Sequence, residues 1–158
     1  SDLLRHASSS QVNLGIDVPH GHYAADSMRA TVVPNRNMMM LSIATAYAIT
    51  LKADYVAYAA HAGDHAIYPD CRPEFTQAMA TAMHVCDDHK VMLLAEFINH
   101  TKTQICKDGD LLGVPWGLTW SCYEGLELHC GKCGTCIERK EAFRDAGVKD
   151  VTQYEPEA

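Results

Sequence analysis

Four of the chain's seven cysteines lie within fifteen residues, in the spacing Cys122-x7-Cys130-x2-Cys133-x2-Cys136. The glycines between the last three cysteines allow the tight turns that bring neighbouring sulfurs onto one ion. Four thiolates that leave no coordination position open are typical of a structural zinc site and not of a catalytic one. The pattern therefore predicts a zinc ion held by all four cysteines, which ties this part of the fold to metal binding.

Two other interpretations of the cysteines remain open. A C-x2-C-x2-C run also occurs in ferredoxins, but there a Cys-Pro usually follows, whereas Ile137 follows the last cysteine here. Disulfides are less favoured, because no signal peptide is recognisable and Cys71, Cys86 and Cys106 stand in apolar or helical surroundings. Such cysteine usage is typical of a reduced cytoplasmic protein, and zinc is the favoured ligand.

Composition narrows the class of protein. The 158 residues suffice for one domain with a core, and no apolar run reaches the length of a membrane span. A net charge of −7 argues against a nucleic-acid surface, which needs clustered Lys and Arg. We therefore expect neither a membrane nor a nucleic-acid partner. Several of the nine histidines stand in polar contexts typical of surface or capping residues: His20, His22, His84 and His89.

Local signals alternate between helix and strand along the chain. Residues 1–27 are polar and irregular, which predicts a loop or partly disordered lead-in, and residues 30–33 resemble a short extended piece. The predicted helices start at an N-cap Asn37, at Pro73 and after an N-cap Thr101, and a last one spans about 135–146. The predicted strands are residues 53–60 and 91–95.

This order of elements is typical of an α/β fold with a parallel sheet. The first helix is apolar nearly all round, so we expect it to be buried between layers, and we expect the second strand to be buried on both faces. Two strands are too few for a self-sufficient sheet. The sequence therefore predicts further strands upstream or pairing with another chain.

The loop after the first predicted strand, residues 61–72, is the densest cluster of polar groups. Ligands collect beyond the carboxyl ends of strands in α/β sheets, which is where this loop lies. Asp64 and Asp70 offer carboxylates for Mg²⁺ or for the N–H edge of a guanine-like base, and Arg72 offers a fork for phosphate or carboxylate. A surface loop whose aspartates make turns and cap a helix is the alternative. A metal pair of His61 and His65 needs a helix, which Gly63 disfavours.

Two further cations are candidate anion-binding residues. Arg36 lies at the predicted N-terminus of the first helix, where backbone N–H groups and the helix dipole attract negative charge. The alternative is a capped helix with a solvated arginine. Lys102 lies in the first turn of the third helix, where a positive charge opposes the dipole and so favours a functional role.

Three sequence blocks together resemble the 7-cyano-7-deazaguanine synthase family. The blocks are Val33-Pro34-Asn35-Arg36-Asn37, then residues 61–75 (HAGDHAIYPDCRPEF), then Thr119-Trp120-Ser121-Cys122-Tyr123 with residues 130–136 (CGKCGTC). The likeness extends from about Pro19 to Tyr154. Three blocks in the same order make a highly specific match.

The resemblance implies an ATP-dependent ligase of the PP-loop superfamily (N-type ATP pyrophosphatases), with an adenine nucleotide alpha hydrolase-like, Rossmann-like sheet. It implies conversion of 7-carboxy-7-deazaguanine and ammonia to the nitrile in queuosine biosynthesis, with ATP and Mg²⁺ activating first the acid and then the amide. It also implies a cytoplasmic homodimer and a structural zinc on the four cysteines above. The expected catalytic residues are Asp70 and Lys102, and the expected substrate- or ATP-binding residues are Arg36, Asn37, Asp64, His65, Tyr68 and Arg72.

One departure from the family is plain. The family's ATP-binding loop, Ser-Gly-Gly-x-Asp-Ser, is absent, and the chain contains no two adjacent glycines. The residues are therefore expected to be the C-terminal part of such an enzyme: an incomplete α/β domain over residues 1–118 and a zinc-binding segment over 119–158. We expect this part alone to be inactive, because nothing in it cradles a triphosphate. A non-catalytic, zinc-stabilised deazaguanine-binding domain remains the alternative, and an iron–sulfur PP-loop relative is a more distant one.

Overall fold

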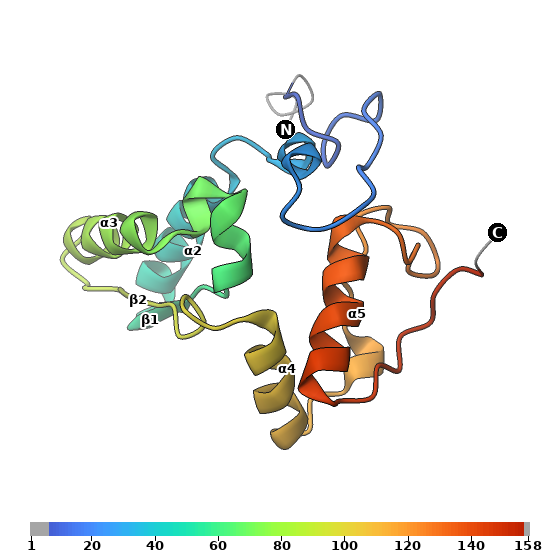
Figure 1. The fold of residues 1–158 in the computed structure, drawn as a ribbon. Helices are drawn as coiled ribbons and strands as arrows, with labels where there is room; N and C mark the ends of the chain where they lie inside the picture. The colour runs from blue at the N-terminus through green and yellow to red at the C-terminus, as the bar shows by residue number, and fades with distance from the viewer. Residues whose placement is uncertain (1–6, 157–158) are drawn as a thin grey trace. The chain divides into compact units, whose positions relative to one another are not determined.

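The computed structural model describes residues 7–156, which fall into two compact units (Figure 1). Pro34–Asn99 form one of them, named here the α/β unit. The described residues before Pro34 and from His100 onward form the other, named the cysteine unit. The predicted division of the chain into an incomplete α/β domain over residues 1–118 and a zinc-binding segment over 119–158 stays a prediction.

The α/β unit confirms the predicted fold class. Its elements are α2 (Arg36–Leu51), β1 (Tyr55–Ala57), α3 (Pro73–Val85) and β2 (Met92–Leu94). The two strands pair in parallel, with Tyr55 opposite Met92 and Ala57 opposite Leu94. Parallel strands need a crossover connection, and here it contains α3.

The core of this unit forms where the two helices meet the sheet. Leu41 and Ala48 from α2 pack with Met79 and Met83 from α3 and with Val91 beside β2. Spacing of three, four or seven residues places such side chains on one face of a helix. Met83 and Val91 are almost completely buried, so the contact between α3 and the sheet is the part of the unit least accessible to solvent.

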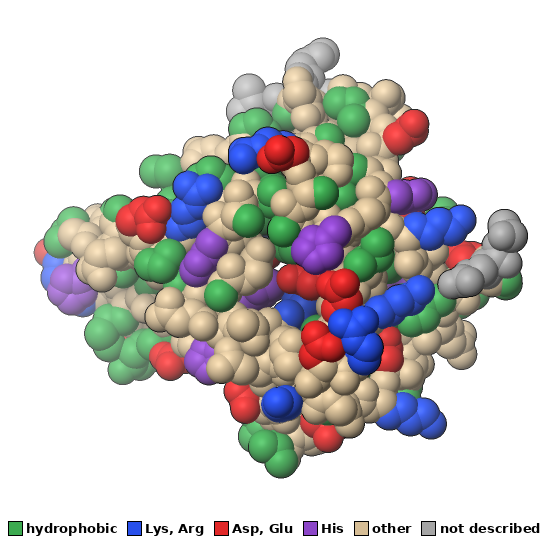
Figure 2. All heavy atoms as spheres, viewed as in Figure 1, with side chains coloured by type: hydrophobic (Ala, Val, Ile, Leu, Met, Phe, Trp, Pro, Cys, Tyr) green, Lys and Arg blue, Asp and Glu red, His purple; other side chains and the backbone are tan. Residues whose placement is uncertain are grey.

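The rest of the apolar surface is less buried than the sequence predicts. On α2, Met40, Ile43 and Tyr47 are 61%, 72% and 66% exposed. Exposed hydrophobic side chains are visible on the surface in Figure 2. The expectation of a helix buried all round, and of a second strand buried on both faces, is wrong for the described residues, because a two-stranded sheet covers only one side of α2 and leaves Met92 44% exposed.

Helix boundaries differ from the predicted ones in two places. Asn35, in a left-handed conformation with φ 58°, is the N-cap of α2, so the predicted cap Asn37 lies inside the first turn. α3 ends at Val85 and not near residue 90, because the polar bends that follow carry two consecutive aspartates. Existence and type of both helices are as predicted.

The cysteine unit is built around two packed helices. They are α4 (Lys102–Leu111) and α5 (Gly134–Ala146), and the short 3-10 turns η1 (Asp26–Thr31) and η4 (Trp116–Leu118) accompany them. Cys106 of α4 packs with Phe143 of α5 in a small core. The predicted start of α4 is confirmed, because Thr101 and Gln104 form a capping box. The predicted end of α5 is confirmed as well, since Gly147 closes it at φ 70°.

The segment before α2 has more structure than a lead-in loop. Residues 30–33 were expected to be extended, but η1 runs through Thr31, whose hydroxyl donates to the carbonyl of Met28 at 2.7 Å. Met28 is fully buried and contacts the start of α5: a Cβ on Gly134 would lie 2.5 Å from its sulfur. The close approach therefore requires glycine at that position. Residues 1–6 of the predicted lead-in lie outside the described residues.

Within residues 7–156, no helix is both long and apolar enough to span a bilayer.

Candidate functional site

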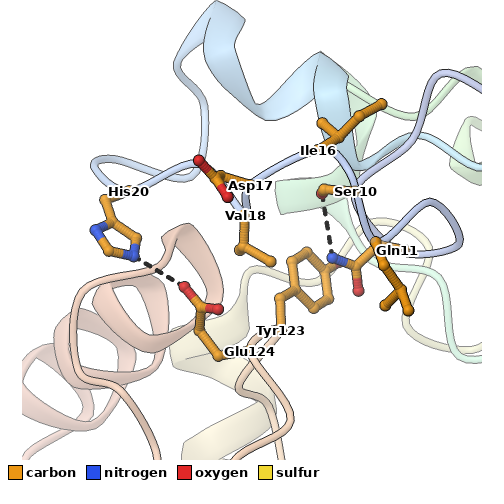
Figure 3. Close-up of a pocket in the computed structure, with 9 residues that line it drawn as sticks. Ser10, Gln11, Ile16, Asp17, Val18, His20, Tyr123 and Glu124 are labelled. Atoms are coloured by element: carbon orange, nitrogen blue, oxygen red, sulfur yellow. Dashed lines mark hydrogen bonds and ion pairs between the residues drawn. The ribbon is translucent and has the colours of Figure 1, made fainter.

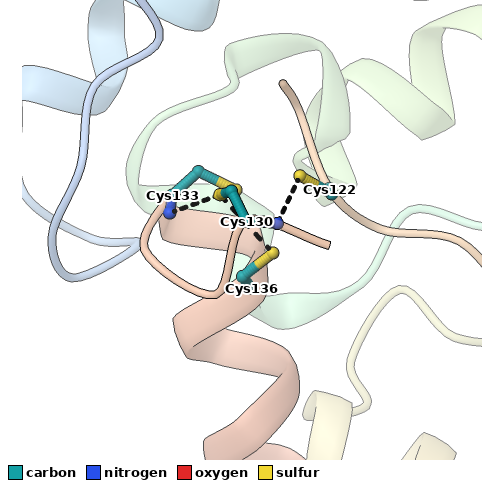
Figure 4. A group of neighbouring side chains, drawn as sticks. All are labelled: Cys122, Cys130, Cys133 and Cys136. Atoms are coloured by element: carbon teal, nitrogen blue, oxygen red, sulfur yellow. Dashed lines mark hydrogen bonds between the residues drawn. The ribbon is translucent and has the colours of Figure 1, made fainter. Parts of the chain in front are cut away.

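The four predicted metal-binding cysteines come together at the N-terminus of α5 (Figure 4). Their Sγ atoms all lie within 4.8 Å of one another, and all four residues are buried. Cys130 and Cys136 approach to 4.0 Å between sulfurs. All seven cysteines are free thiols, so the disulfide alternative does not describe this structure.

Backbone N–H groups point at the sulfurs. The N–H of Cys130 donates to Sγ of Cys122 at 3.3 Å, and the N–H groups of Lys132 and Cys133 donate to Sγ of Cys130 at 3.4 and 3.3 Å. The turn that permits this contains Gly131 at φ 71°. Such donors stabilise thiolate over thiol, so the loop is arranged for anionic sulfur.

The ionisation of the sulfurs is tightly linked. A hydrogen bond from Cys136, together with the hydroxyl of Thr135, lowers the pKa of Cys133 despite its burial. The same hydrogen bond to Cys133, and then burial, raises the pKa of Cys136. One thiolate thus forms readily while its neighbour retains a proton, and a divalent cation is the group that allows all four to ionise.

The geometry fits a tetrahedral zinc ion. Zn–S bonds of about 2.3 Å put sulfurs roughly 3.8 Å apart, close to the observed 4.0 Å between Cys130 and Cys136. Four buried thiolates without an open position also match the donor set of structural zinc sites. The cluster therefore fits a structural metal site, and its residues would hold the ion without taking part in chemistry.

Aromatic and polar side chains brace the cysteine loop from outside. The indole of Trp120 donates to the carbonyl of Cys122 at 2.9 Å and stacks on His129 with 4.1 Å between ring centroids. Nε2 of His129 accepts from the N–H of Ser121 at 3.2 Å. Burial, with the charge of Arg139, lowers the pKa of His129, so the ring stays neutral and can accept this bond at neutral pH.

A buried arginine joins three segments of the cysteine unit. Arg139 of α5 donates to Thr152 at 2.7 Å, to Thr119 at 2.9 Å and to the carbonyl of Trp116 at 3.2 Å. Its Nε lies 3.6 Å from a carboxylate oxygen of Asp150. The fixed fork of a guanidinium suits several acceptors at once. Arg139 thus fixes η4 and the C-terminal strand-like segment against α5.

The polar loop after β1 lies entirely in the α/β unit and forms two 3-10 turns. They are η2 (Ala62–Ala66) and η3 (Pro69–Cys71). The sequence disfavours a helix at Gly63, but the short 3-10 helix η2 contains Gly63 and begins after the N-cap His61. Asp64 completes the capping box, and its carboxylate lies 3.5 Å from Nε2 of His61. Asp64 is therefore engaged in shaping the loop.

Asp70 caps a helix, although not the one that follows it. Its Oδ2 accepts from the backbone N–H of Asn37, in the first turn of α2, at 3.2 Å. The amide of Asn37 in turn donates to Sγ of Cys71 at 3.4 Å. Asp70 thereby binds one of the backbone N–H groups at the N-terminus of α2, the position predicted from the sequence to attract an anion. A capping role for Asp70 is present in this structure, and its catalytic role stays a prediction.

Behind Asp70 lies a buried thiol–phenol pair. The hydroxyl of Tyr58 donates to the carbonyl of Asp70 at 2.5 Å and lies 3.4 Å from Sγ of Cys71. Burial raises the pKa of the Cys71 thiol to about 11 and also raises that of Tyr58, so both stay protonated at neutral pH. The pair is a neutral support that fixes the loop on the end of β1.

Two arginines of the α/β unit have guanidinium N–H groups that are available for further hydrogen bonds. Arg72 donates through Nε to the carbonyl of His65 at 2.9 Å, and Arg36 donates through Nε to the side chain of Asn37 at 3.4 Å. Among the described residues, no partner is found for the terminal nitrogens of either. Nε2 of His65 is buried without a hydrogen-bond partner in the same part of the structure. These three side chains are the ones best suited to meet a ligand, whereas Tyr68 is 6% exposed and packs in the loop.

Lys102 has a partner within the cysteine unit. Its Nζ forms an ion pair with Glu138 of α5 at 2.5 Å, and the same nitrogen lies 5.5 Å from the ring centroid of Tyr23. An ion pair between α4 and α5 accounts for a lysine in the first turn of a helix. Its predicted catalytic role remains a prediction.

Comparison with known proteins agrees with the sequence blocks and the cysteine cluster. The family model described as queuosine biosynthesis protein QueC matches residues 2–147. The chain belongs to the QueC family. It is 56% identical over 95% of its length to the 7-cyano-7-deazaguanine synthase of Methanoregula boonei, covering 69% of that protein, and 54% identical over 96% to that of Caldicellulosiruptor saccharolyticus, covering 67%. The chain thus spans about two thirds of the length of these relatives.

Membership of the QueC family confirms the resemblance found in the sequence. It leaves individual roles in the polar loop untested, since the family match covers the whole region and not single residues. Several supporting residues were not foreseen: Tyr58, His129, Arg139 and Asp150. These residues act through contacts between positions 8 to 23 residues apart in the sequence, and a lone arginine inside a helix carries no local signal of such contacts.

Proposed function

We propose that the protein containing this chain is an ATP-dependent ligase that converts 7-carboxy-7-deazaguanine and ammonia into 7-cyano-7-deazaguanine. The observation that carries this proposal is 56% identity over 95% of the chain to a protein named 7-cyano-7-deazaguanine synthase. The clustering of Cys122, Cys130, Cys133 and Cys136 supports it, because the sequence blocks that resemble this family include them.

In this proposal the cysteine unit contributes stability and the α/β unit contributes ligand contacts. Zinc on the four thiolates would hold the loop before α5, with no role in bond making. Arg36 and Arg72 would offset phosphate or carboxylate charge through their terminal nitrogens. Nε2 of His65, buried and without a hydrogen-bond partner, would meet a polar atom of the substrate.

ATP with Mg²⁺ is the co-substrate in the proposal, and the protein would work as a cytoplasmic homodimer. A phosphate-binding Ser-Gly-Gly-x-Asp-Ser loop is expected for the triphosphate, and these 158 residues do not contain it. Assays therefore require the full-length protein. The carboxylate of Asp70 would stand next to the reacting groups or to Mg²⁺, in addition to capping α2.

The decisive experiment measures ATP consumption by the purified full-length protein with and without each of the other substrates. We expect turnover only when both 7-carboxy-7-deazaguanine and ammonia are present, and mass spectrometry should show the nitrile. ATP consumption that does not depend on the acid, or no turnover with an intact ATP loop, would contradict the assignment.

A non-catalytic deazaguanine-binding domain is the second candidate, favoured by the lack of adjacent glycines in the chain. It predicts that calorimetry detects binding of the deazaguanine base and no binding of ATP. ATP binding by the full-length protein would exclude this candidate.

A further inference from the structure

A second group of metal-binding side chains lies beside the four-cysteine cluster. A ring nitrogen of His20, a carboxylate oxygen of Glu124 and Sγ of Cys130 lie within 4.8 Å of one another. All three belong to the cysteine unit, but His20 is exposed and Cys130 is buried. Imidazole, carboxylate and thiolate together are a donor set that zinc accepts.

The position of His20 is fixed by the backbone and not by its side chain alone. His20 forms an isolated antiparallel bridge with Cys133, and the N–H of Gly21 donates to the carbonyl of Lys132 at 3.1 Å. The segment before η1 is thus attached to the cysteine loop at the point where the loop carries its ligands. Glu124 follows Cys122 by two residues, so both His20 and the half-buried Glu124 are attached to the loop that carries the cysteines.

The distance between His20 and Glu124 suits one cation. Nε2 of His20 and Oε1 of Glu124 lie 3.0 Å apart. Two ligand atoms with metal bonds of about 2.0–2.1 Å are separated by roughly 2.9–3.4 Å on one ion. A divalent cation can therefore replace the hydrogen that bridges the two atoms.

Charge also favours a second cation at this place. A metal ion on the four cysteines ionises their thiols, so that site would have an excess of negative charge next to the carboxylate of Glu124. Asp17 adds another carboxylate to the surroundings of His20 and Glu124. A second divalent cation would reduce the electrostatic repulsion between the negatively charged cysteine site and the nearby carboxylates, which lie only a few ångströms apart.

The site opens to solvent. His20, Glu124 and Asp17 line a groove of about 670 Å³, with Tyr123 and Val18 contributing apolar surface (Figure 3). A cation that has three protein ligands at the edge of a groove keeps positions for water, unlike an ion enclosed by four cysteines.

We propose that His20, Glu124 and Cys130 form a second divalent transition-metal site, with the Cys130 thiolate bridging to the ion held by the four cysteines. This proposal goes beyond the ligase function and rests only on a metal ion in the four-cysteine site. Zinc is the expected occupant, because it accepts nitrogen, sulfur and oxygen ligands in one site.

The test is a titration of the full-length protein, already loaded with one equivalent of zinc, with further Zn²⁺. Equilibrium dialysis with elemental analysis should show a second, weaker equivalent. Glu124→Gln should weaken that equivalent by at least about tenfold, the lower limit for losing even an outer partner of a metal ligand. The matched control is His22→Ala, because His22 is two residues away and pairs with Glu141 at 3.8 Å.

Cadmium NMR tests the bridge itself. With ¹¹³Cd in both positions, a shared thiolate should give two resonances that couple to each other, and Glu124→Gln should leave only the resonance of the four-cysteine site. His20→Ala should do the same.

Three outcomes would overturn the proposal. One is the absence of a second equivalent in the wild-type protein. Another is a second equivalent that Glu124→Gln and His20→Ala leave unchanged. The third is loss of both ions in Glu124→Gln, which would make this side chain a support of the first site.

Discussion

The two units differ in whether their own residues suffice to form a complete site. In the cysteine unit four buried thiolates, their backbone donors and the bracing aromatic rings all come from within the unit. In the α/β unit the polar loop rests on a two-stranded sheet, and apolar side chains such as Ile43 and Tyr47 of α2 remain exposed. The cysteine cluster is complete within its own unit. The α/β unit instead has hydrogen-bond donors, such as those of Arg36 and Arg72, that are available to a ligand.

The largest expected effect tests whether the cysteine unit depends on its metal. Cys133→Ser should abolish zinc binding and unfold this unit, because structural zinc supplies about 10 kcal/mol or more of binding free energy that is linked to folding. Elemental analysis and tryptophan fluorescence measure both, since Trp116 and Trp120 belong to this unit. Cys86→Ser is the control, because Cys86 is exposed and only donates to the carbonyl of Met83 at 3.3 Å.

If Cys133→Ser retains zinc and its fluorescence is unchanged, the cysteine unit does not depend on its metal for folding, and this contrast with the α/β unit is wrong. Iron in the purified wild-type protein, together with visible colour, would instead support the iron–sulfur alternative.

The same contrast explains how far the sequence could predict the structure. The four-cysteine cluster was predictable because its members are spaced by local turns, and Cys-x-x-Cys spacing is itself the geometric signal. The helices and both strands were predictable from their caps and apolar patterns, such as the capping box at Thr101. The surroundings of Asp70 were not, because its partner Asn37 lies 33 residues away. Burial of α2 was overestimated, since apolar composition does not reveal what covers a helix.

The second prediction separates charge from capping at Asp70. Asp70→Asn keeps an oxygen that can accept from the N–H of Asn37, but removes the negative charge. If Asp70 acts on substrate or Mg²⁺, this change should lower turnover by about 10³-fold, the upper end for losing one transition-state contact. Stability should hardly change, whereas Asp70→Ala should lose both activity and about 1 kcal/mol from the lost cap.

Turnover assays and urea unfolding of the two variants measure these effects. Full activity in Asp70→Asn would reduce Asp70 to a capping residue, and the α/β unit would then resemble the cysteine unit in using its carboxylates for structure alone.

The third prediction concerns the internal bracing of the cysteine unit. Arg139→Ala should destabilise the protein by about 3 kcal/mol, because it leaves Asp150 and several hydroxyl groups without their buried partner. Arg139→Lys should recover only part of this, since an ammonium lacks the guanidinium fork. The control on the same helix is Arg144→Ala, which removes an exposed pair with Asp145 and should leave stability nearly unchanged. Equal effects of Arg139→Ala and Arg144→Ala in urea unfolding would contradict a bracing role.

The smallest expected effect is a pH dependence that Asp150 confers on the same unit. Burial acts against the charged form of Asp150, but hydrogen bonds from Thr152 and Tyr154, together with Arg139, outweigh it and lower its pKa.

A carboxyl group whose pKa is lower in the folded than in the unfolded state stabilises the fold above its unfolded pKa of about 3.9. That contribution, about 1 kcal/mol at neutral pH, should disappear as the pH falls through the folded pKa. Because acid also protonates the metal-binding cysteines, the quantity to measure is the difference in unfolding free energy between wild type and Asp150→Asn, which keeps one of the two acceptor oxygens and removes the charge. This difference should shrink from pH 7 towards about pH 3, and a difference that is constant with pH would show that the charge of Asp150 adds nothing to the brace.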